Sequence, residues 1–443
     1  MLESNTLKEE LKLKFRSCEG EVKKIKAMRS ASERIDSYTL MIRNVLSKSS
    51  LCYIDGELSF FNGIVYSPVQ LKALQIIISN ILPDLGVGAS DARKIGEMPY
   101  SVIWERSYHS DTDKACFANA VYDISTGRIH SFSSDIICNY NLPYALAKTD
   151  RCPMWEKFLS EVMPDEDEQS CLQEFFGMCY VDRSKCSIEK MALLIGKGAN
   201  GKSVIFDVMK NVIGIKWVSF LSPDQLLDSK QVVSVQGKKL NFSPDIKRSS
   251  AFDSGLKALS SSQDIQGWQL YQGNVVIKCP PLMFAFNEMP RFKDETDAFF
   301  RRLMPFTFDI TIPPLKQDKE LASKICKEEL GGIFLWVMQG KRRLEKSSGK
   351  FTECRKIDNA VEIMKNKIRC EQNPTLNYIE SIGYGISPAY TGQLFDKVTA
   401  SSIYEGMGGK YSKAFITKEL NMLKVRHDRG SEVRYYLYKH TDI

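Results

Sequence analysis

Hydrophobic residues near the start of the chain recur at helical spacing. Between residues 1 and 48 they alternate with charged residues, and this pattern predicts one or two amphipathic helices. The apolar positions of the pattern include Leu7, Leu11, Leu13, Phe15, Val22, Ile25 and Met28.

The next stretch changes to shorter, β-like runs. Residues 51–66 contain two such runs, broken at Asp55-Gly56 and at Asn62-Gly63. Both dipeptides favour the turns of β-hairpins. A further β-like patch covers residues 117–124 and is followed by a turn at 125–127. With the preceding helices, these strands predict a mixed α+β domain over residues 1–150.

The middle of the chain combines helical spacing with buried-strand runs. Residues 153–179 follow a helical pattern whose apolar positions are Trp155, Phe158, Leu159, Val162, Leu172, Phe175 and Phe176. From residue 188, short apolar runs alternate with longer helical stretches, which indicates an α/β domain. Residues 341–343 and 347–350 are typical of a turn or linker. We therefore predict a second domain over residues 151–345.

The last region, residues 371–443, predicts a small basic domain. Its pattern indicates an amphipathic helix near residues 415–423, then a β-hairpin that turns at Arg429-Gly430. Residues 410–443 carry eight lysines and arginines against four acidic residues. A helix followed by a basic hairpin favours a winged-helix-like domain that binds duplex DNA, and a small α+β cap with a basic surface is the alternative. The expected DNA contacts are Lys424, Arg426, Arg429 and Arg434.

Composition limits the class of protein. The chain has 443 residues, 43% of them hydrophobic and 26% charged, which is typical of a soluble protein of two or three domains. A formal charge of +7 is compatible with a polyanionic partner without identifying one. The 12 cysteines include no Cys-x-x-Cys pair, so we expect reduced thiols and no structural zinc. The N-terminus is polar, and no apolar run could span a bilayer. We expect a cytoplasmic, DNA-associated protein of a bacterial host, without a membrane partner.

The strongest local signal is a glycine-rich loop at residues 196–203. An apolar strand-like run, residues 191–195, precedes it, and a helical pattern over 204–213 follows. This order is typical of a phosphate-binding loop. The three glycines are expected to curve the backbone so that successive N–H groups face one phosphate. Residues expected to bind ATP are Gly196, Lys197, Gly198, Ala199, Asn200, Gly201, Lys202 and Ser203.

Hydrolysis needs more groups than the loop supplies. Within the loop, Lys202 is expected to reach the β- and γ-phosphates, and Ser203 to bind Mg²⁺. A short apolar run ends at Asp245, a candidate Mg²⁺ ligand, and another ends at Asn287, a candidate for sensing the phosphate. The pair Arg301 and Arg302 would stabilise negative charge in the transition state, from a neighbouring subunit. A plain surface arginine pair is the alternative.

These motifs together resemble the superfamily 3 helicases of the phage- and plasmid-type (poxvirus-type) primase-helicase family. Residues 120–127, 152–159 and 172–177 resemble the domain that precedes the helicase in that family. Residues 196–203 match its nucleotide loop, and residues 240–245 fall where its acidic strand belongs.

Later motifs of the family are also present in the expected order. Asn287, followed by Pro290, resembles the sensor, and Arg301-Arg302 resembles the arginine-finger region. Residues 332–340 resemble the segment that closes the motor. The resemblance implies an AAA+-like P-loop motor that forms a ring, usually a hexamer, with ATP between subunits and single-stranded DNA in the channel.

The sequence departs from the family at two points. The family often has Glu, or two consecutive acids, at the end of the acidic strand, whereas here Pro244 precedes a lone Asp245. This difference leaves open which group activates the attacking water. The N-terminal third also has no evident primase site, so a separate primase or polymerase is a further candidate partner.

Between the acidic strand and the sensor, residues 257–278 resemble the segment whose β-hairpin projects into the ring channel. Its turn is expected at residues 271–274. Polar and aromatic groups at such a tip can contact phosphates and stack on bases, although an exposed hairpin without a ligand is the alternative. The expected DNA contacts are Tyr271, Gln272, Asn274 and Lys278.

Three functions remain open at this point. The leading prediction is an ATP-driven replicative DNA helicase, or replication initiator, of a phage, plasmid or mobile genetic element. The alternative is a DNA-bound ATPase switch that loads or recruits host replication proteins without unwinding. The third is a nucleotide-binding assembly protein that has lost hydrolysis, for which Pro244 is the supporting feature.

Overall fold

The computed structural model describes residues 2–96, 106–182, 186–244, 246, 255–261, 264–271, 273–288, 296–386, 395–423, 425–429 and 433–439. The chain divides into two compact units. One comprises Met1–Trp155, Val208–Ile215 and Ala322–Met338, and the other comprises Glu156–Asp207, Lys216–Leu321 and Gln339–Ile443. The predicted domain limits stay predictions, and the predicted mixture of α and β structure is confirmed.

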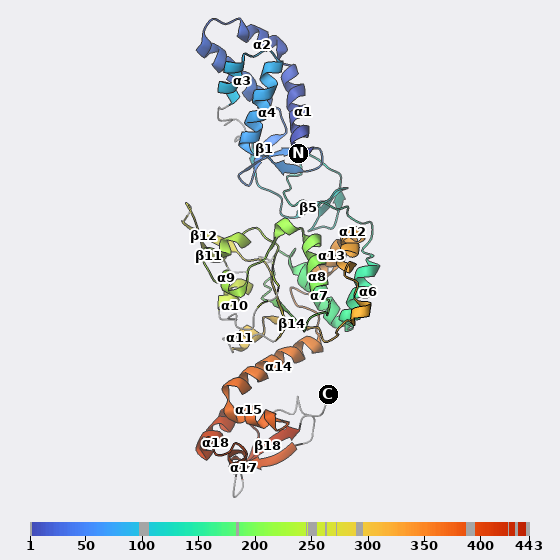
Figure 1. The fold of residues 1–443 in the computed structure, drawn as a ribbon, viewed down its shortest axis with the longest axis vertical. Helices are drawn as coiled ribbons and strands as arrows, with labels where there is room; N and C mark the ends of the chain where they lie inside the picture. The colour runs from blue at the N-terminus through green and yellow to red at the C-terminus, as the bar shows by residue number, and fades with distance from the viewer. Residues whose placement is uncertain are drawn as a thin grey trace. The chain divides into compact units, whose positions relative to one another are not determined.

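Helices at the start of the first unit share one hydrophobic core with the strands that follow (Figure 1). They are α1 (Leu2–Arg16), α2 (Glu19–Lys26), α3 (Ala31–Ser47), α4 (Leu71–Asp84) and α5 (Ala89–Gly96). Residues 1–48 thus hold three helices where one or two were predicted. The extra break has a local cause, because Ser30 caps α3 by accepting a hydrogen bond from the Glu33 N–H. Leu13, expected on the apolar face, is 70% exposed.

Two small sheets complete this unit. The first has the order β3-β2-β1-β4, and the second has the order β5-β6-β7. Their strands are β1 (Leu51–Ile54), β2 (Glu57–Phe61), β3 (Tyr66–Pro68), β4 (Ser107–Tyr108), β5 (Lys114–Cys116), β6 (Val121–Asp123) and β7 (Ile129–His130). The predicted hairpins at Asp55-Gly56 and Asn62-Gly63 are confirmed, with positive φ at Asp55, Gly56 and Gly63. The β-like patch at 117–124 was partly wrong, since Phe117 and Ala120 close the turn between β5 and β6.

A parallel five-stranded sheet forms the core of the second unit, in the order β14-β8-β13-β10-β9. The strands are β8 (Met191–Ile195), β9 (Val218–Ser219), β10 (Leu240–Ser243), β13 (Leu282–Phe286) and β14 (Leu303–Thr307). Every residue of β8, β10 and β13 is buried, as expected for parallel strands covered on two faces. Because the strands are parallel, all their carboxyl ends lie at one edge of the sheet.

The helices and short turns between residues 153 and 372 are α6 (Pro153–Val162), α7 (Glu166–Met178), α8 (Lys202–Ile213), η2 (Ile215–Trp217), α9 (Pro223–Leu226), η3 (Val232–Val235), α10 (Gly255–Ser260), α11 (Asp297–Phe300), η4 (Pro314–Lys316), α12 (Leu321–Glu328), α13 (Leu330–Lys346) and α14 (Arg355–Gln372). Of these, nearly all of α12, α13 as far as Met338 and α8 from Val208 onward belong to the first unit. The prediction of a turn or linker at residues 341–343 was wrong, because α13 continues through them. Arg343 of this helix forms an ion pair of 2.9 Å with the buried Glu174. The chain turns after α13, where Ser348 and Gly349 have positive φ.

An antiparallel hairpin extends outward from the second unit (Figure 1) and consists of β11 (Asp264–Gln269) and β12 (Gly273–Lys278). The last part of the unit is a separate small sheet with helices. Its elements are α15 (Pro374–Ser381), β15 (Tyr384–Gly385), β16 (Phe395–Thr399), α17 (Ala400–Gly406), α18 (Lys413–Met422), β17 (His427–Arg429) and β18 (Val433–Lys439). In this sheet β18 pairs with β15, β16 and β17. The predicted helix near 415–423 and the hairpin after it are confirmed.

Candidate nucleotide site

The glycine-rich loop lies between strand β8 and helix α8, as the sequence predicted. Strand β8 is the second of the five strands and is paired on both sides, with β13 and β14, so the loop emerges at the carboxyl end of an inner strand. Helix α8 begins at Lys202 and runs for 12 residues. The N–H groups of its first turn and its partial positive charge lie at the loop end, where they favour an anion.

Two glycines of the loop are required by its geometry, for different reasons. Gly201 has φ +90°, and a Cβ there would meet Phe158 at 3.0 Å and Val162 at 2.9 Å. Gly196 is needed because a Cβ would meet the Phe308 carbonyl oxygen at 2.6 Å. By contrast, Gly198 has open space around its Cα, and Ala199, not a glycine, takes the other positive φ of the loop, +60°. The expectation that all three glycines curve the backbone was therefore correct only in part.

Lys202 is 8% exposed, and its ammonium group points back across the loop. It donates hydrogen bonds to the carbonyl oxygens of Gly196 and Lys197 and to Asn200 Oδ1, the last at 3.2 Å. A buried cation surrounded by these acceptors lies where a phosphate group would face the N-terminus of α8. Ser203, the next residue, is exposed.

A segment after β14 holds the loop in place. The Phe308 N–H donates to the Ile195 carbonyl oxygen at 2.7 Å, and the Ile312 N–H donates to the Ala199 carbonyl oxygen at 2.9 Å. The buried side chain of Asn200 donates from Nδ2 to the Phe308 carbonyl oxygen at 3.4 Å. Asn200 therefore connects Lys202 to Phe308, the residue directly after β14. The sequence did not indicate this structural role.

Asn287 follows directly after β13, and its side chain is exposed. The preceding residue, Phe286, accepts a hydrogen bond of 3.1 Å from the Gly196 N–H, so Asn287 is next to the start of the loop. On the other side of β13, the Ile246 N–H donates to the Ala285 carbonyl oxygen at 3.0 Å. Asp245, the candidate Mg²⁺ ligand, lies outside the described residues.

The arginine pair lies at the amino ends of the strands, opposite the ends from which the loop emerges. Arg301 and Arg302 immediately precede β14, and the Arg302 carbonyl oxygen accepts a hydrogen bond of 2.8 Å from the Met191 N–H at the start of β8. Since β8 has five residues, roughly 13 Å of strand separates this edge from the loop, at about 3.3 Å per residue. The two arginines therefore do not converge with Lys202 within one chain.

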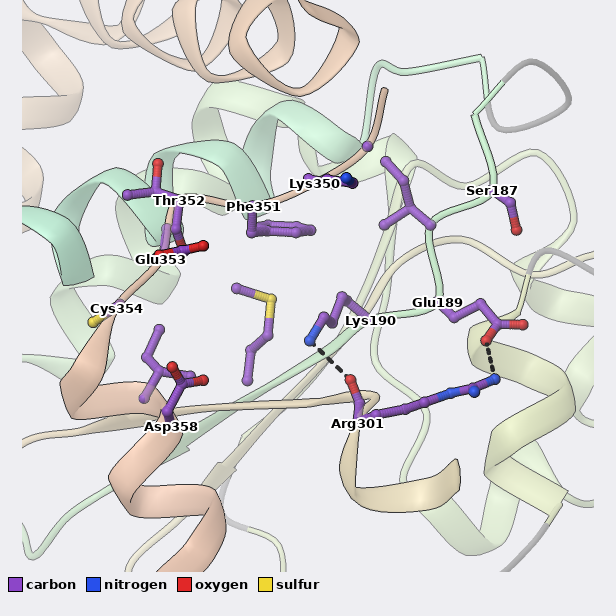
Figure 2. A pocket seen from close by; sticks show the side chains of 15 residues that line it. Ser187, Glu189, Lys190, Arg301, Lys350, Phe351, Thr352, Glu353, Cys354 and Asp358 are labelled. Atoms are coloured by element: carbon purple, nitrogen blue, oxygen red, sulfur yellow. Dashed lines mark hydrogen bonds and ion pairs between the residues drawn. The ribbon is translucent and has the colours of Figure 1, made fainter. Parts of the chain in front are cut away.

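The two arginines differ in their surroundings. The Arg301 side chain is 64% exposed and borders a cavity of about 480 Å³ (Figure 2), whereas the Arg302 side chain is 9% exposed. Glu189 forms ion pairs with both, at 3.0 Å and 2.9 Å. Lys190, in the same cavity, has a pKa below its ordinary value because burial removes water from its ammonium group, although the nearby Asp358 opposes this shift. Neither Glu189 nor Lys190 stood out in the sequence, because a lone Glu-Lys pair carries no motif.

The β11–β12 hairpin has one covered face and one open face. Ile277 is fully buried, and Gly267 lies against its side chain, where a Cβ would meet Cδ1 at 2.3 Å. On the open face lie Gln266, Trp268, Asn274, Val276 and Lys278, all exposed. Tyr271, at the tip, is 96% exposed and has φ +68°. Of the four residues predicted to contact DNA here, Gln272 lies outside the described residues. Trp268 was not among the predicted contacts, although the alternation of residues in β11 could have placed it on the open face.

Three of the C-terminal residues predicted to bind DNA, Arg426, Arg429 and Arg434, lie in or directly before the β17–β18 hairpin. Arg426 and Arg434 are exposed, and the Arg426 guanidinium stacks 4.7 Å from the Tyr436 ring centre. Lys397 also approaches this ring and pairs with Asp428 at 2.6 Å, and this hydrogen bond raises the pKa of Lys397. Lys424 and the side chain of Arg429 lie outside what the structure describes. The Glu419 carboxylate is buried and accepts a hydrogen bond of 3.1 Å from the Thr375 N–H.

Comparison with known proteins finds a family model that matches part of the chain. Residues 102–164 match the family model described as D5 N terminal like. This segment includes residues 120–127 and 152–159, which were predicted to resemble the domain preceding a primase-type helicase, so that part of the resemblance is confirmed. Residues 172–177 lie beyond the match, and the superfamily 3 assignment stays a prediction.

Two curated proteins are similar to the chain. "Putative helicase L207/L206" of Acanthamoeba polyphaga mimivirus is 23% identical over 259 residues, which cover 55% of this chain and 26% of the mimivirus protein. "Uncharacterized mitochondrial protein ymf21" of Marchantia polymorpha is 28% identical over 111 residues, which cover 22% of this chain and 61% of that protein. The chain therefore spans about a quarter and about three-fifths of these two relatives.

Among solved structures, the NrS-1 C-terminal region is similar to this chain with a TM-score of 0.48 at 12% identity. The likeness covers 88% of this chain and 95% of that one. Within the described residues, no helix is long and apolar enough to cross a membrane.

Proposed function

We propose that this protein is an ATP-dependent DNA helicase of the superfamily 3, AAA+-like type, which acts in replication of a mobile genetic element. The observation that carries the proposal is the loop at 196–203 between a buried inner strand and the N-terminal end of a helix, with Lys202 aimed across it. The strand order around this loop and the similarity to a mimivirus protein named as a helicase support the same conclusion.

ATP and Mg²⁺ fit the residues of the loop. The N-terminus of α8 and Lys202 would bind the β- and γ-phosphates, and the exposed Ser203 would supply an oxygen ligand to Mg²⁺. Asp245 would be the second protein ligand. Bound Mg²⁺ would withdraw charge from the phosphates as they are cleaved. Asn287, beside Gly196, would contact the γ-phosphate or the attacking water.

The separation between the loop and the arginines supports a site shared by two subunits. Arg301 is at the far edge of the sheet from its own loop and is open to solvent, so it would reach the nucleotide of a neighbouring copy. A repeated head-to-tail contact of this kind closes into a ring, and a hexamer is the expected form. Arg302 is buried and would act by holding Glu189, which also pairs with Arg301.

DNA would be bound at two places. Trp268, Tyr271 and Lys278 on the open side of the hairpin would contact single-stranded DNA in the ring channel, by stacking and by charge. The elements α15, β15, β16, α17, α18, β17 and β18 follow one another in the last part of the chain, an order compatible with a winged helix. In such a domain α18 would enter the major groove of duplex DNA and the β17–β18 hairpin would contact its backbone.

Strand separation on forked DNA tests this proposal. The intact protein, with ATP and Mg²⁺, is expected to unwind forks of one polarity, and Lys202→Ala is expected to abolish unwinding. ATP hydrolysis without unwinding of either polarity would instead indicate the second candidate, a DNA-bound switch that recruits host replication proteins. Nucleotide binding without hydrolysis would indicate an assembly protein.

A further inference from the structure

Three consecutive residues hold the Arg301-Arg302 dipeptide from the neighbouring strand. Glu189 Oε2 lies 3.0 Å from Arg301 Nη2 and 2.9 Å from Arg302 Nη2. Lys190 Nζ donates to the Arg301 carbonyl oxygen at 2.8 Å, and the Met191 N–H donates to the Arg302 carbonyl oxygen at 2.8 Å. Both the side chain and the main chain of Arg301 are thus held by the residues that lead into β8 (Figure 2).

Arg301 and Arg302 differ in their burial and in their hydrogen-bond partners. Arg302 is buried, and its Nη1 also donates to the Ala298 carbonyl oxygen, so it fixes the Glu189 carboxylate in place. Arg301 is 64% exposed. A long exposed side chain ordinarily samples many rotamers, and the fixed carboxylate restricts this one.

The contact leaves most of the Arg301 guanidinium available. A guanidinium has five N–H donors, and within the described residues the Glu189 contact uses Nη2 alone. The side chain faces an open cavity of about 480 Å³ rather than a packed interior. An anion could therefore bind the remaining donors without displacing Glu189.

We propose that Glu189 and Lys190 are positioning residues for Arg301, which hold its guanidinium ready for the triphosphate bound by a neighbouring copy of this chain. The inference rests on the proposed function, because it requires a site shared between subunits. Orienting a charged group before the reaction lowers the barrier by removing the need to order it in the transition state. Glu189 and Lys190 would then affect turnover and leave nucleotide binding unchanged.

Steady-state ATP hydrolysis of Glu189→Gln, Lys190→Met and Arg301→Ala tests this. Glu189→Gln keeps a hydrogen-bond acceptor of the same size for Arg302, and Lys190→Met keeps the apolar stem. We expect each to lower kcat about five- to tenfold with KM unchanged, and Arg301→Ala to lower kcat at least a hundredfold. Melting temperatures report whether each variant folds.

Unchanged or increased kcat in both Glu189→Gln and Lys190→Met, with Arg301→Ala impaired, would overturn this inference but leave the shared site in place. No effect of Arg301→Ala would instead overturn the shared site.

Mixing subunits separates positioning in trans from a structural role. Lys202→Ala subunits have an intact Arg301 edge, and Glu189→Gln subunits have an intact loop. In an equimolar mixture, about a quarter of the interfaces combine the two intact parts by random assortment. The mixture should then exceed either variant alone and reach about a quarter of wild-type turnover. Turnover at half that of Glu189→Gln alone, or less, would show that Glu189 acts only within its own subunit and would refute the inference.

Discussion

The backbone N–H of Gly196 donates a hydrogen bond of 3.1 Å to the carbonyl oxygen of Phe286. This bond joins the first residue of the glycine-rich loop to the last residue of β13. Asn287 comes next along the chain, so a polar side chain and the loop that would hold a triphosphate start from the same point of the sheet. Gly196 and Phe286 come together because parallel strands end at one edge of the sheet, although they are 90 positions apart in the sequence.

Gly201 and Gly198 should respond differently to alanine. Gly201→Ala places a Cβ 2.9 Å from Val162 at φ +90°, so we expect a loss of about 2–4 kcal/mol in the free energy of unfolding. Gly198→Ala meets no atom within 4 Å and should change stability by less than about 0.5 kcal/mol. Urea unfolding of both variants measures this. Equal losses would mean that the loop backbone is not as described.

Removing the aromatic tip of the hairpin should weaken binding to single-stranded DNA. Tyr271→Ala and Trp268→Ala each remove an exposed ring, 96% and 40% exposed, and each should cost about 1–3 kcal/mol of binding free energy. Melting temperature should not change in Tyr271→Ala, because that ring is almost fully exposed, whereas Trp268→Ala also loses the contact with the Lys230 ammonium, 5.4 Å from its ring centre. Fluorescence anisotropy with a labelled oligonucleotide measures the affinity. Leu13→Ala, also at an exposed apolar residue, is the matched control, and a similar loss there would refute a role for the hairpin.

Arg434 should contribute to duplex binding through charge. It is exposed on β18, opposite Asp428 in the hairpin register. Arg434→Ala is expected to weaken duplex binding at low salt and to reduce the slope of log K against log salt by about one. Titrations at several salt concentrations measure the slope. An unchanged slope would remove Arg434 from the DNA contact.

Asp123 should make stability depend on pH within the segment that matches the family model. Burial raises the pKa of this carboxyl, but hydrogen bonds from the Thr126 N–H, the Ser125 hydroxyl and Lys114 outweigh it and hold the pKa well below its ordinary value. A lowered folded pKa stabilises the protein above the unfolded pKa of about 3.9, and the contribution is lost as pH falls.

Asp123→Asn should therefore cost about 2 kcal/mol at pH 7, and the difference from wild type should shrink progressively below about pH 4. Denaturant unfolding at pH 7 and at pH 3 measures the difference in the free energy of unfolding between the variant and wild type. Asp84→Asn, at an exposed residue, is the control and should show little difference at either pH. A destabilisation by Asp123→Asn that is the same at pH 7 and pH 3 would contradict the role of the charge.

Local patterns predicted the helices and strands, whereas the burial and pairing of individual side chains depend on residues far apart in the sequence. The run at Met191–Ile195, the loop and the following helix could be identified because their signal is contiguous. Sequence could not reveal that Arg302 is buried while Arg301 is open, or that both pair with Glu189, because Glu189 is more than 100 residues away along the chain. Nor could it reveal that Glu419 is buried, because its partner Thr375 comes from another helix.

Turnover of ATP by wild type and by Lys202→Ala tests the central claim most directly. The Lys202 ammonium donates hydrogen bonds to Gly196, Lys197 and Asn200 of the loop, so its loss should remove the cation that would bind the phosphates. Lys157→Ala, on an exposed side chain of α6, is the matched control. We predict that Lys202→Ala lowers kcat at least about a hundredfold, whereas Lys157→Ala retains wild-type turnover. Equal turnover in all three proteins would contradict the assignment of this loop as a triphosphate site.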